Sequence, residues 1–487
     1  TKIGCWKSVV ENIKNKLNKS TLVSTHQSLD SEISILINLF KKGLYDQVIE
    51  KGKQVLSKFE SSYMVTNIIG SAYLKIRDYD NARIYNEKTI VLNKKFDEGY
   101  YNLAYTYWQL GQLDLAEKNC LKVLKLNLNA QLVGFANNML GNLAESKNNL
   151  NSAKKFYFKA YDLDNSNHDA IFNYTLIHLY LGIFDIGWKY YDNRWETFSY
   201  LSNFNKDKPT WSKYIIKRPY WSPVVSSDHH VTIWPEQGIG DFILMSRFLN
   251  DLKKTTDHIT LLISHKLKPI YARTFPHIEF ITELNTSAID YHAPIGDLAK
   301  FYVNSFEDVK ARSDVYLAVD KSRTQKIKQL LPKGKKICGI SWVSKNETIG
   351  QKKSMSLEDL KDLLLLPDIT FVDLQYSDTS EERASFKDKY GVEILKLEEI
   401  DNFNDIDGLA SLIDACDQVI SVSNTTVHIA GSIGKETYLM LPQGKGRLWY
   451  WSKEEEQSIW YKSVQVIEQT KIGCWKSVVE NIKNKLN

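Results

Sequence analysis

A period of about 34 residues runs through residues 29–195 and constrains this chain more than any other feature. Small residues recur at positions 8 and 20 of the period, and aromatic residues recur between them. In the clearest unit, residues 97–130, the periodic positions hold Tyr100, Leu103, Ala104, Tyr107, Gly111, Ala116, Val123 and Leu126. Units of this size bury their apolar faces only by stacking on their neighbours. The period therefore predicts a right-handed helical solenoid with a concave face suited to extended peptides.

The same pattern recurs in residues 63–96 and, after a slip of three residues, in 134–167, while 29–62 and 168–195 follow it more loosely. The matching positions are Gly70, Tyr73, Tyr79, Ala82, Gly141, Ala153, Tyr157, Ala160, Gly182 and Tyr191. The pattern resembles that of tetratricopeptide repeats, in which two helices touch at the small residues. This resemblance implies a protein-binding module over residues 29–195, and a scaffolding or dimerising role is the alternative.

From residue 230 onward, strand-like and helix-like segments alternate. The predicted strands are 230–236, 258–264, 278–282, 337–342, 370–375, 392–396, 418–423 and 436–441, and the predicted helices are 241–254, 266–275, 356–366, 381–390, 407–416 and 426–433. Such alternation favours parallel sheets covered by helices on both faces, with ligands at the carboxyl ends of the strands. A charged connector near 318–336 divides the segments into two doubly wound domains, 226–325 and 330–469. We expect a linker at 196–225 and a last helix at 470–487.

One segment occurs twice. Residues 1–18 recur without a mismatch at 470–487. Natural repeats diverge, so this identity favours an assembly artefact or a reading frame carried around a circular template. We assign the first copy no function.

Composition excludes several classes of protein. Lys+Arg 63 against Asp+Glu 58 gives a net charge of +5, with the two signs interspersed, which does not fit a nucleic-acid-binding surface. No apolar run reaches the roughly 18 residues of a membrane-spanning helix, and no secretory signal opens the chain. The cysteines are scattered and form no CxxC pair. They indicate reduced thiols in a cytoplasmic protein without a metal site.

One candidate site lies at 231–242, where an apolar strand runs into Glu-Gln-Gly-Ile-Gly-Asp and then a helix. Gly238 and Gly240 permit unusual backbone angles and a close approach of a ligand. Free N–H groups at the helix start suit an anion, and Asp241 could act as a base. The spacing is half of a Gly-x-Gly-x-x-Gly fingerprint, with Ile243 in place of the third glycine. The alternative is an ordinary turn in which Asp241 caps the helix.

Three more polar segments follow predicted strands. Residues 341–345 lead to Lys353, whose cation could meet phosphate oxygens or lie on a solvated loop. Residues 421–431 bring Asn424, Thr425 and Thr426 to a helix start suited to a diphosphate. His428 shares that first turn, although a lone histidine there is more often packed or capping. Residues 442–447 form a basic loop with Gly444 and Lys445, or a plain surface turn.

Together these motifs resemble bacterial repeat-containing glycosyltransferases whose second half is similar to glycosyltransferase family 9, the heptosyltransferase-like family. The segments that carry the resemblance are 182–195, 236–241, 339–342, 373–375 and 421–434. The resemblance implies a GT-B pair of Rossmann-like domains that binds a nucleotide sugar mainly through the second domain. It implies no metal and no cofactor beyond that substrate. The fold class is thus an α-solenoid followed by two α/β domains.

The resemblance also assigns roles. It implies that Asp241 is the catalytic base, that Lys353 contacts phosphate or developing charge, and that Thr425, Thr426 and His428 hold the diphosphate. Heptosyltransferases usually begin that last segment with Asp-Thr-Gly, where this chain has Ser423-Asn424-Thr425, which argues against an ADP-heptose donor. Glu381 or Glu382 could supply the acidic donor contact of the family.

The leading hypothesis is an inverting glycosyltransferase whose repeats present a protein acceptor. The first alternative is transfer to a lipopolysaccharide or lipid-linked glycan. The second is a non-catalytic repeat adaptor on a degenerate transferase domain. The sequence names neither the sugar nor the acceptor nor the oligomeric state.

Overall fold

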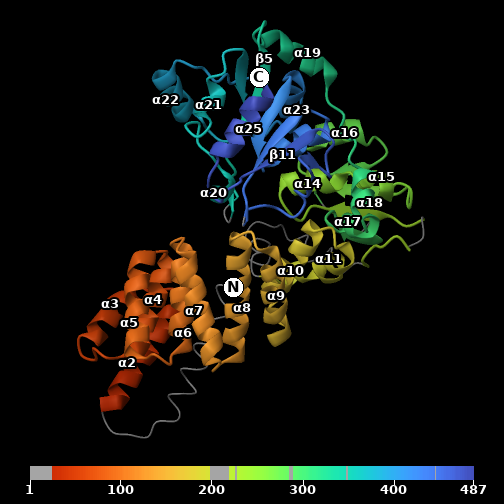
Figure 1. Cartoon of the computed structure of the whole chain (residues 1–487). Helices are drawn as coiled ribbons and strands as arrows, with labels where there is room; N and C mark the ends of the chain where they lie inside the picture. Colours follow the sequence, from red (N-terminus) through yellow and green to blue (C-terminus); the bar gives the residue numbers. More distant parts are fainter. Residues whose placement is uncertain are drawn as a thin grey trace. The chain divides into compact units, whose positions relative to one another are not determined.

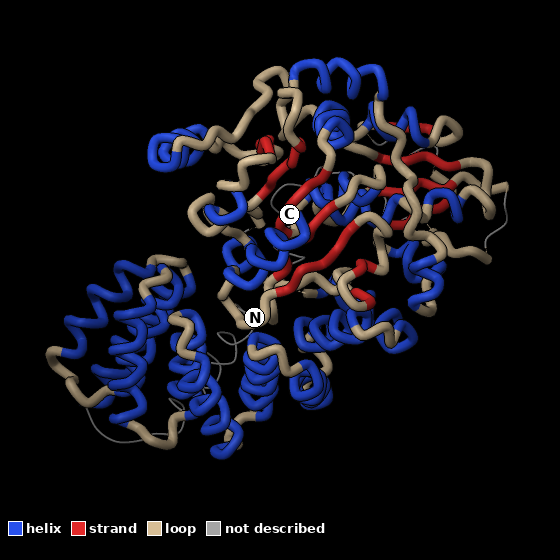
Figure 2. The backbone as a smooth tube through the Cα atoms, turned by 45° about the horizontal axis from the view of Figure 1, so that its top comes forward, coloured by secondary structure: helices blue, strands red, loops and turns tan. Residues whose placement is uncertain are grey.

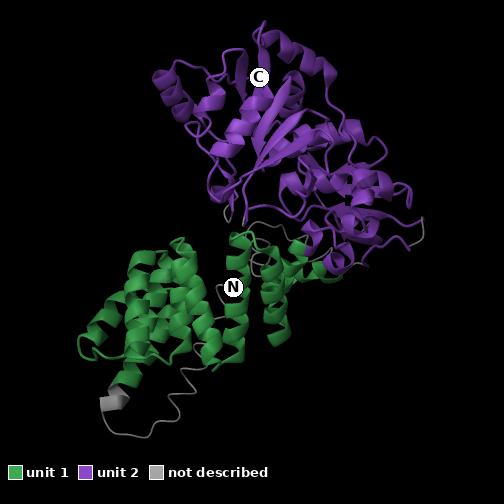
Figure 3. Cartoon of the chain, viewed as in Figure 1, with its two compact units in different colours: residues 1–177, 189–204 green, residues 178–188, 205–487 purple. Residues whose placement is uncertain are grey.

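The computed structural model describes residues 25–197, 219–224, 228–283, 289–346, 349–444 and 446–486. The chain forms two compact units, 1–177 with 189–204 and 178–188 with 205–487 (Figure 3). The duplicated segment 1–18, most of the expected linker 196–225, and Lys445 lie outside the described residues.

Paired helices follow one another in the repeat region (Figure 1). They are α2 (Thr25–Lys41), α3 (Tyr45–Leu56), α4 (Tyr63–Ile76), α5 (Tyr79–Leu92), α6 (Asp97–Gln109), α7 (Leu113–Leu126), α8 (Ala130–Ser146), α9 (Leu150–Leu163), α10 (His168–Tyr180) and α11 (Phe184–Tyr190), followed by the 3-10 turn η1 (Tyr191–Glu196). Figure 2 shows helices and loops in the described part of the first unit and strands in the second. Each pair falls within one predicted repeat unit, apart from the first residues of α2 and α8.

The small periodic residues are buried where two helices touch. Ala82, Ala116 and Ala153 are fully buried at position 20 of their units. At position 8, a Cβ on Gly141 would lie 2.4 Å from the ring of Tyr157. The periodic small residues are therefore required by helix contact, as the sequence predicts.

Gly141→Ala is expected to destabilise the first unit by about 1–3 kcal/mol, because the added methyl overpacks the contact. The Tyr157 ring cannot move aside easily, since it is fully buried and its hydroxyl bonds Asn142 at 3.1 Å and Glu145 at 2.8 Å. Urea unfolding followed by circular dichroism measures the change. Gly134→Ala in the same helix is the matched control, because its Cβ would meet nothing closer than 3.5 Å. Equal stability of the two variants would contradict this account of the packing.

The second unit contains two sheets. The first has the order β3-β2-β1-β4, all parallel, from β1 (Val231–Trp234), β2 (Ile259–Leu262), β3 (Glu279–Ile281) and β4 (Tyr291–Pro294). The second has the order β6-β5-β7-β8-β11-β10-β9, from β5 (Lys336–Ser341), β6 (Ile369–Asp373), β7 (Gln418–Val422), β8 (Thr437–Leu441), β9 (Lys453–Glu454), β10 (Gln457–Ser458) and β11 (Val464–Glu468). The neighbouring strands β6, β5, β7, β8 and β11 pair in parallel. Strand β10 pairs antiparallel with both β11 and β9. The second sheet is thus mixed, and the expectation of wholly parallel sheets is wrong for it.

In this unit, helices lie between most of the consecutive strands as far as β8. They are α14 (Ile239–Ser246), α15 (Leu249–Leu252), α16 (Lys268–Thr274), α17 (Asp297–Tyr302), α18 (Phe306–Lys310), α19 (Lys321–Leu330), α20 (Gly350–Lys353), α21 (Lys361–Leu364), α22 (Ser380–Tyr390), α23 (Ile406–Ala415), α24 (Thr425–Ser432) and α25 (Lys476–Leu486). Apolar residues of α21, α22 and α25 form one core with the second sheet. Among the described residues, no helix is both long and apolar enough to cross a membrane.

Three predicted elements differ from the structure. Segment 392–396 contributes only one bridge, Val372 to Leu395, rather than a strand. Segment 356–366 is helical only over α21, because its earlier turns close by bonds between residues three apart, such as Leu360 N to Leu357 O. Segment 241–254 divides into α14 and α15, since Phe248 N bonds Met245 O in the same tight manner. Strand β4 was not predicted, because Tyr-His-Ala-Pro has no strand-like alternation.

The end of the last predicted repeat belongs to the α/β unit, because residues 178–188 pack within it. Trp188 Nε1 donates to Val303 O at 2.6 Å, and its ring meets Trp449 edge to face at 5.8 Å. The guanidinium of Arg447 lies 4.0 Å from the ring centre of Tyr180. The repeat pattern is therefore correct in secondary structure at 168–195, but part of this segment completes another unit.

Candidate active site

Asp241 lies in the first turn of α14, after the carboxyl end of β1. Gly238 is the N-cap residue, so Asp241 is not the cap. Gly238 has φ −67°, and Gly240 lies inside the helix, so neither glycine is needed for an unusual backbone angle. This corrects the expectation drawn from the sequence.

Asp241 is half-buried. Burial raises its pKa, while a hydrogen bond from Tyr450, the charge of Lys353 and the backbone N–H groups of Asp241 and Gly238 oppose the rise. A carboxylate with a raised pKa is a stronger base. The site thus holds a carboxylate that suits proton transfer.

Lys353 is the last residue of α20, in the segment that follows β5. Its side chain is buried, and burial lowers its pKa to about 8, against the opposing effect of the Asp241 charge. The structure brings these two predicted residues into electrostatic contact. Within the part of the chain that is described, no hydrogen bond or ion pair involves the Lys353 ammonium. Its positive charge is therefore available to a ligand anion.

Asn424 caps helix α24, and its side chain is fully used inside the protein. Its Oδ1 accepts from Thr426 N at 3.0 Å and from Ser421 Oγ at 3.1 Å. Its Nδ2 donates to Ser341 Oγ at 2.7 Å and to Val343 O at 3.2 Å. Asn424 thus ties the ends of β5 and β7 together and sets the position of the helix start. Direct contact with a donor stays a prediction.

The two threonines that follow differ in exposure. Thr425 is half-buried, whereas Thr426 is fully buried and its Oγ1 has no hydrogen-bond partner among the described residues. A buried hydroxyl without a partner is costly unless a ligand or water satisfies it. The start of α24 therefore offers a hydroxyl and backbone N–H groups to an anion.

The starts of α14 and α24 contact each other where Gly240 packs against His428. A Cβ on Gly240 would lie 2.7 Å from His428 Cδ2, so only glycine permits this approach. The His428 ring is buried, stacks on Trp451 at 5.0 Å and lies edge to face with Tyr450 at 5.3 Å. Burial and the charges of Lys353 and Arg247 lower its pKa to about 3. His428 is therefore a neutral imidazole at physiological pH.

The basic loop after β8 has a more structural character than the sequence indicates. Gly444 adopts φ 68°, which favours glycine, and its carbonyl accepts from Arg447 N at 3.3 Å. Arg447 pairs with Glu468 at 2.8 Å. Gly446 approaches Lys352, since its Cβ would lie 3.3 Å from the Cβ of that lysine. Donor contacts by Gly444 and Lys445 stay predictions.

Sequence reasoning missed the aromatic residues that surround the site. Tyr450 forms a hydrogen bond with Asp241, and Trp451 stacks on the ring of His428. The hydroxyl of Tyr461 lies 3.0 Å from His428 Nδ1. The run Trp449-Tyr450-Trp451, directly after the basic loop, was the available signal.

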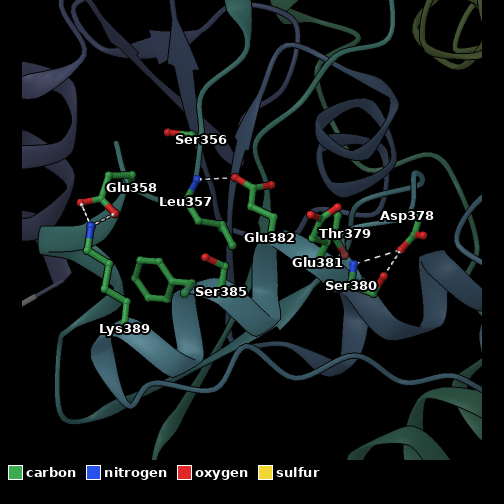
Figure 4. Close-up of a pocket in the computed structure, with 11 residues that line it drawn as sticks. Ser356, Leu357, Glu358, Asp378, Thr379, Ser380, Glu381, Glu382, Ser385 and Lys389 are labelled. Carbon is green, nitrogen blue, oxygen red and sulfur yellow. Dashed lines mark hydrogen bonds and ion pairs between the residues drawn. The ribbon is translucent and has the colours of Figure 1, made fainter.

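A cavity of about 570 Å³ lies elsewhere in this unit, between α22 and the segment before α21 (Figure 4). Glu381 and Glu382 line it, whereas Asp241 and Lys353 do not. Both carboxylate oxygens of Glu382 already accept hydrogen bonds, from Trp342 Nε1 at 3.0 Å and from Leu357 N at 2.8 Å. Of the two candidates for an acidic donor contact, Glu382 therefore has a structural role.

Residues 97–129 and 136–167 match the tetratricopeptide repeat family model, so the first unit contains tetratricopeptide repeats. Over 464 residues the chain is 25% identical to Protein FlbA of Caulobacter vibrioides, covering 90% of this chain and 70% of that protein. Among solved structures, a glycosyl transferase family 9 protein from Veillonella parvula matches 51% of this chain and 88% of its own, with 14% identity and a TM-score of 0.38. The crystal structure of MamA matches 35% of this chain and 97% of its own, with 21% identity and a TM-score of 0.30.

Proposed function

We propose that this protein transfers a sugar from a nucleotide-sugar donor to an acceptor hydroxyl. One observation carries the proposal: the carboxylate of Asp241 interacts electrostatically with the buried ammonium of Lys353. The interaction lies beside the starts of α14 and α24, which contact each other through Gly240 and His428. A carboxylate base and an anion-binding region are the two parts that this reaction requires.

In the proposed reaction, Asp241 takes the proton of the acceptor hydroxyl as its oxygen attacks the anomeric carbon. The bond from that carbon to the diphosphate breaks, and the nucleoside diphosphate leaves with the electron pair. One direct displacement inverts the configuration. General base catalysis of this kind contributes about 10²–10⁴-fold. Lys353 and the N–H groups of α24 stabilise the leaving group, which accounts for a reaction that needs no metal.

The tetratricopeptide repeats support a protein acceptor or partner, because stacked repeats form surfaces that bind extended segments. Transfer to a glycan, with the repeats recruiting a partner, is the other candidate. The GT-B pairing of the two α/β domains and the cytoplasmic location stay predictions.

A titration tests the donor site. We expect one of UDP, GDP, ADP, CMP and dTDP to bind the parent protein in calorimetry, and the Thr425→Ala/Thr426→Ala variant to bind it at least about tenfold more weakly, because two hydroxyls at the helix start are lost. Ser57→Ala, which removes an exposed hydroxyl of the repeat array, is the control. If no nucleotide binds the parent, the adaptor hypothesis becomes the better account.

The pH dependence of kcat/KM is expected to be bell-shaped. Lys353 must carry its proton to stabilise the leaving group, so activity is present below its pKa of about 8 and is lost as pH rises through that value. Asp241 must be ionised to act as a base, so activity is lost as pH falls below its raised pKa. Initial rates at donor concentrations well below KM, with acceptor held constant, measure the profile. Lys353→Arg should move the upper limb to higher pH, and an unchanged upper limb would exclude Lys353 as its cause.

A further inference from the structure

Three buried polar side chains form a row across the carboxyl ends of β6, β5 and β7. Ser341 ends β5, Gln375 follows β6, and Asn424 follows β7. These strands are neighbours in the second sheet and pair in parallel, so their carboxyl ends meet at one edge. Ser341 Oγ lies 3.0 Å from Gln375 Oε1, and Asn424 Nδ2 lies 2.7 Å from Ser341 Oγ. We call the row Gln375–Ser341–Asn424 the polar bridge.

The backbone fixes the direction of every hydrogen bond in the polar bridge. The N–H groups of residues 342–343 can only donate, so the atom of Gln375 that they contact, at 3.2 and 3.0 Å, is its carbonyl oxygen. Ser341 gives its single hydroxyl proton to the same carbonyl oxygen, so from Asn424 it can only accept. Asn424 therefore donates through Nδ2. Its Oδ1 is left to accept from Thr426 N at 3.0 Å, at the start of α24.

The first two members of the polar bridge cannot touch a ligand. Gln375 and Ser341 are both fully buried. The Nε2 of Gln375 also stays inside the protein, because it donates to Val343 O at 3.0 Å. An effect of Gln375 or Ser341 on ligand affinity must therefore pass through the groups that these residues hold.

The polar bridge holds both halves of the proposed anion-binding region. At one end, Asn424 caps α24, and the first N–H groups of a helix have no acceptor within the helix itself. At the other end, Gln375 holds the N–H groups of residues 342–343, where the segment that leads to Lys353 begins. A diphosphate that contacts both the helix start and the Lys353 ammonium needs the two at a fixed spacing, since small misplacements weaken such contacts strongly.

We propose that the polar bridge sets the affinity of the donor site by holding the start of α24 in register with the segment that carries Lys353. Gln375, Ser341 and Asn424 are then positioning residues, and Asn424 serves the donor through the helix that it caps. An asparagine is required at 424, because an aspartate has no proton to give to Ser341 Oγ. This role rests on the proposed function, since it needs a diphosphate at α24.

Ser341→Ala cuts the polar bridge without removing a group that can reach a ligand. We expect calorimetry to show that whichever of UDP, GDP, ADP and dTDP binds the parent binds this variant about fivefold more weakly, as for one lost hydrogen bond. Ser411→Ala is the matched control, because this serine is also fully buried but donates to Asp407 O, at 3.0 Å, within its own helix α23. It should lower the melting temperature by a similar amount and leave nucleotide affinity unchanged.

Asn424→Ser separates the helix cap from the polar bridge. Serine still caps a helix, but its shorter side chain cannot reach Ser341 and Thr426 N together. We expect about the same fivefold loss of affinity. The double variant Ser341→Ala/Asn424→Ser should bind as weakly as Asn424→Ser alone, because Ser341 acts only through Asn424. If the two losses instead multiply in the double variant, Ser341 acts independently and the proposal is wrong.

The same titrations distinguish failure of the polar bridge from failure of the proposed function. Thermal melting shows that each variant is folded. Equal nucleotide affinity of the parent and folded Ser341→Ala would overturn the polar bridge and leave the donor site standing. If Ser341→Ala does not fold, Asn424→Ser decides in its place, and parental affinity of that variant would overturn the proposal. If none of the nucleotides binds the parent, the donor site itself is refuted, and the role of the polar bridge with it.

Discussion

Replacing Asp241 by asparagine is expected to lower the rate of sugar transfer by about 10²–10⁴-fold, because the amide cannot accept the proton of the acceptor hydroxyl. The substitution keeps the size of the side chain and its contact with Tyr450. Nucleotide affinity should therefore change little, and the loss should appear in kcat. Single-turnover transfer with a radiolabelled donor separates the chemical step from binding.

Asp257→Asn is the control for this variant. Asp257 is an exposed carboxylate of the same α/β unit that is paired with Lys253. It lies before the start of β2, whereas the site follows the carboxyl end of the parallel strand β1. It should transfer at the parental rate. Full transfer by folded Asp241→Asn would remove Asp241 from the mechanism and leave the site without a base.

Lys353→Met is expected to lower kcat by about 10²–10³-fold, as when a preorganised charge-stabilising group is lost. Stability should move in the other direction. The lowering of the Lys353 pKa from 10.5 to about 8 corresponds to about 3 kcal/mol of unfavourable burial of the ammonium, and methionine avoids it. We therefore expect the free energy of unfolding near neutral pH to be equal to or higher than that of the parent.

Lys352→Met is the matched control, since the neighbouring lysine is exposed. It should change neither kcat nor stability appreciably. A loss of both activity and stability in Lys353→Met would mean that the lysine serves the fold and not the reaction. Denaturant unfolding and transfer assays on the same preparations provide the two measurements.

The repeats could be predicted because their signal is local and periodic. Gly141 and Ala153 occupy fixed positions in the repeat unit; a Cβ at Gly141 would meet the Tyr157 ring, and Ala153 is fully buried. The strand, turn and helix around Asp241 were predictable for a similar reason, since a strand-like run is followed at once by glycines and a helix pattern. Local patterns of this kind do not depend on the rest of the chain.

The remainder of the site depends on contacts between distant segments. Tyr450 reaches Asp241, and Tyr461 reaches His428, from the segment between β8 and β11, and no local pattern announces such contacts. The reason for Gly240 was also hidden, because it lies in the approach of His428 and not in the backbone angle of the glycine itself. The short helix α21 and the lost strand at 392–396 show the opposite error, in which a good local pattern is overridden by tertiary structure.

The placement of residues 178–188 inside the α/β unit limits how this protein can be divided or lengthened. A fragment that starts after residue 188 would lack Trp188 and leave the carbonyl of Val303 without its donor. Repeats can be inserted or deleted before residue 168 without touching those contacts, whereas residues 178–188 must be kept with the α/β unit. In modular terms, residues 178–188 form a fixed end of the repeat region, and the number of repeats can vary only before it.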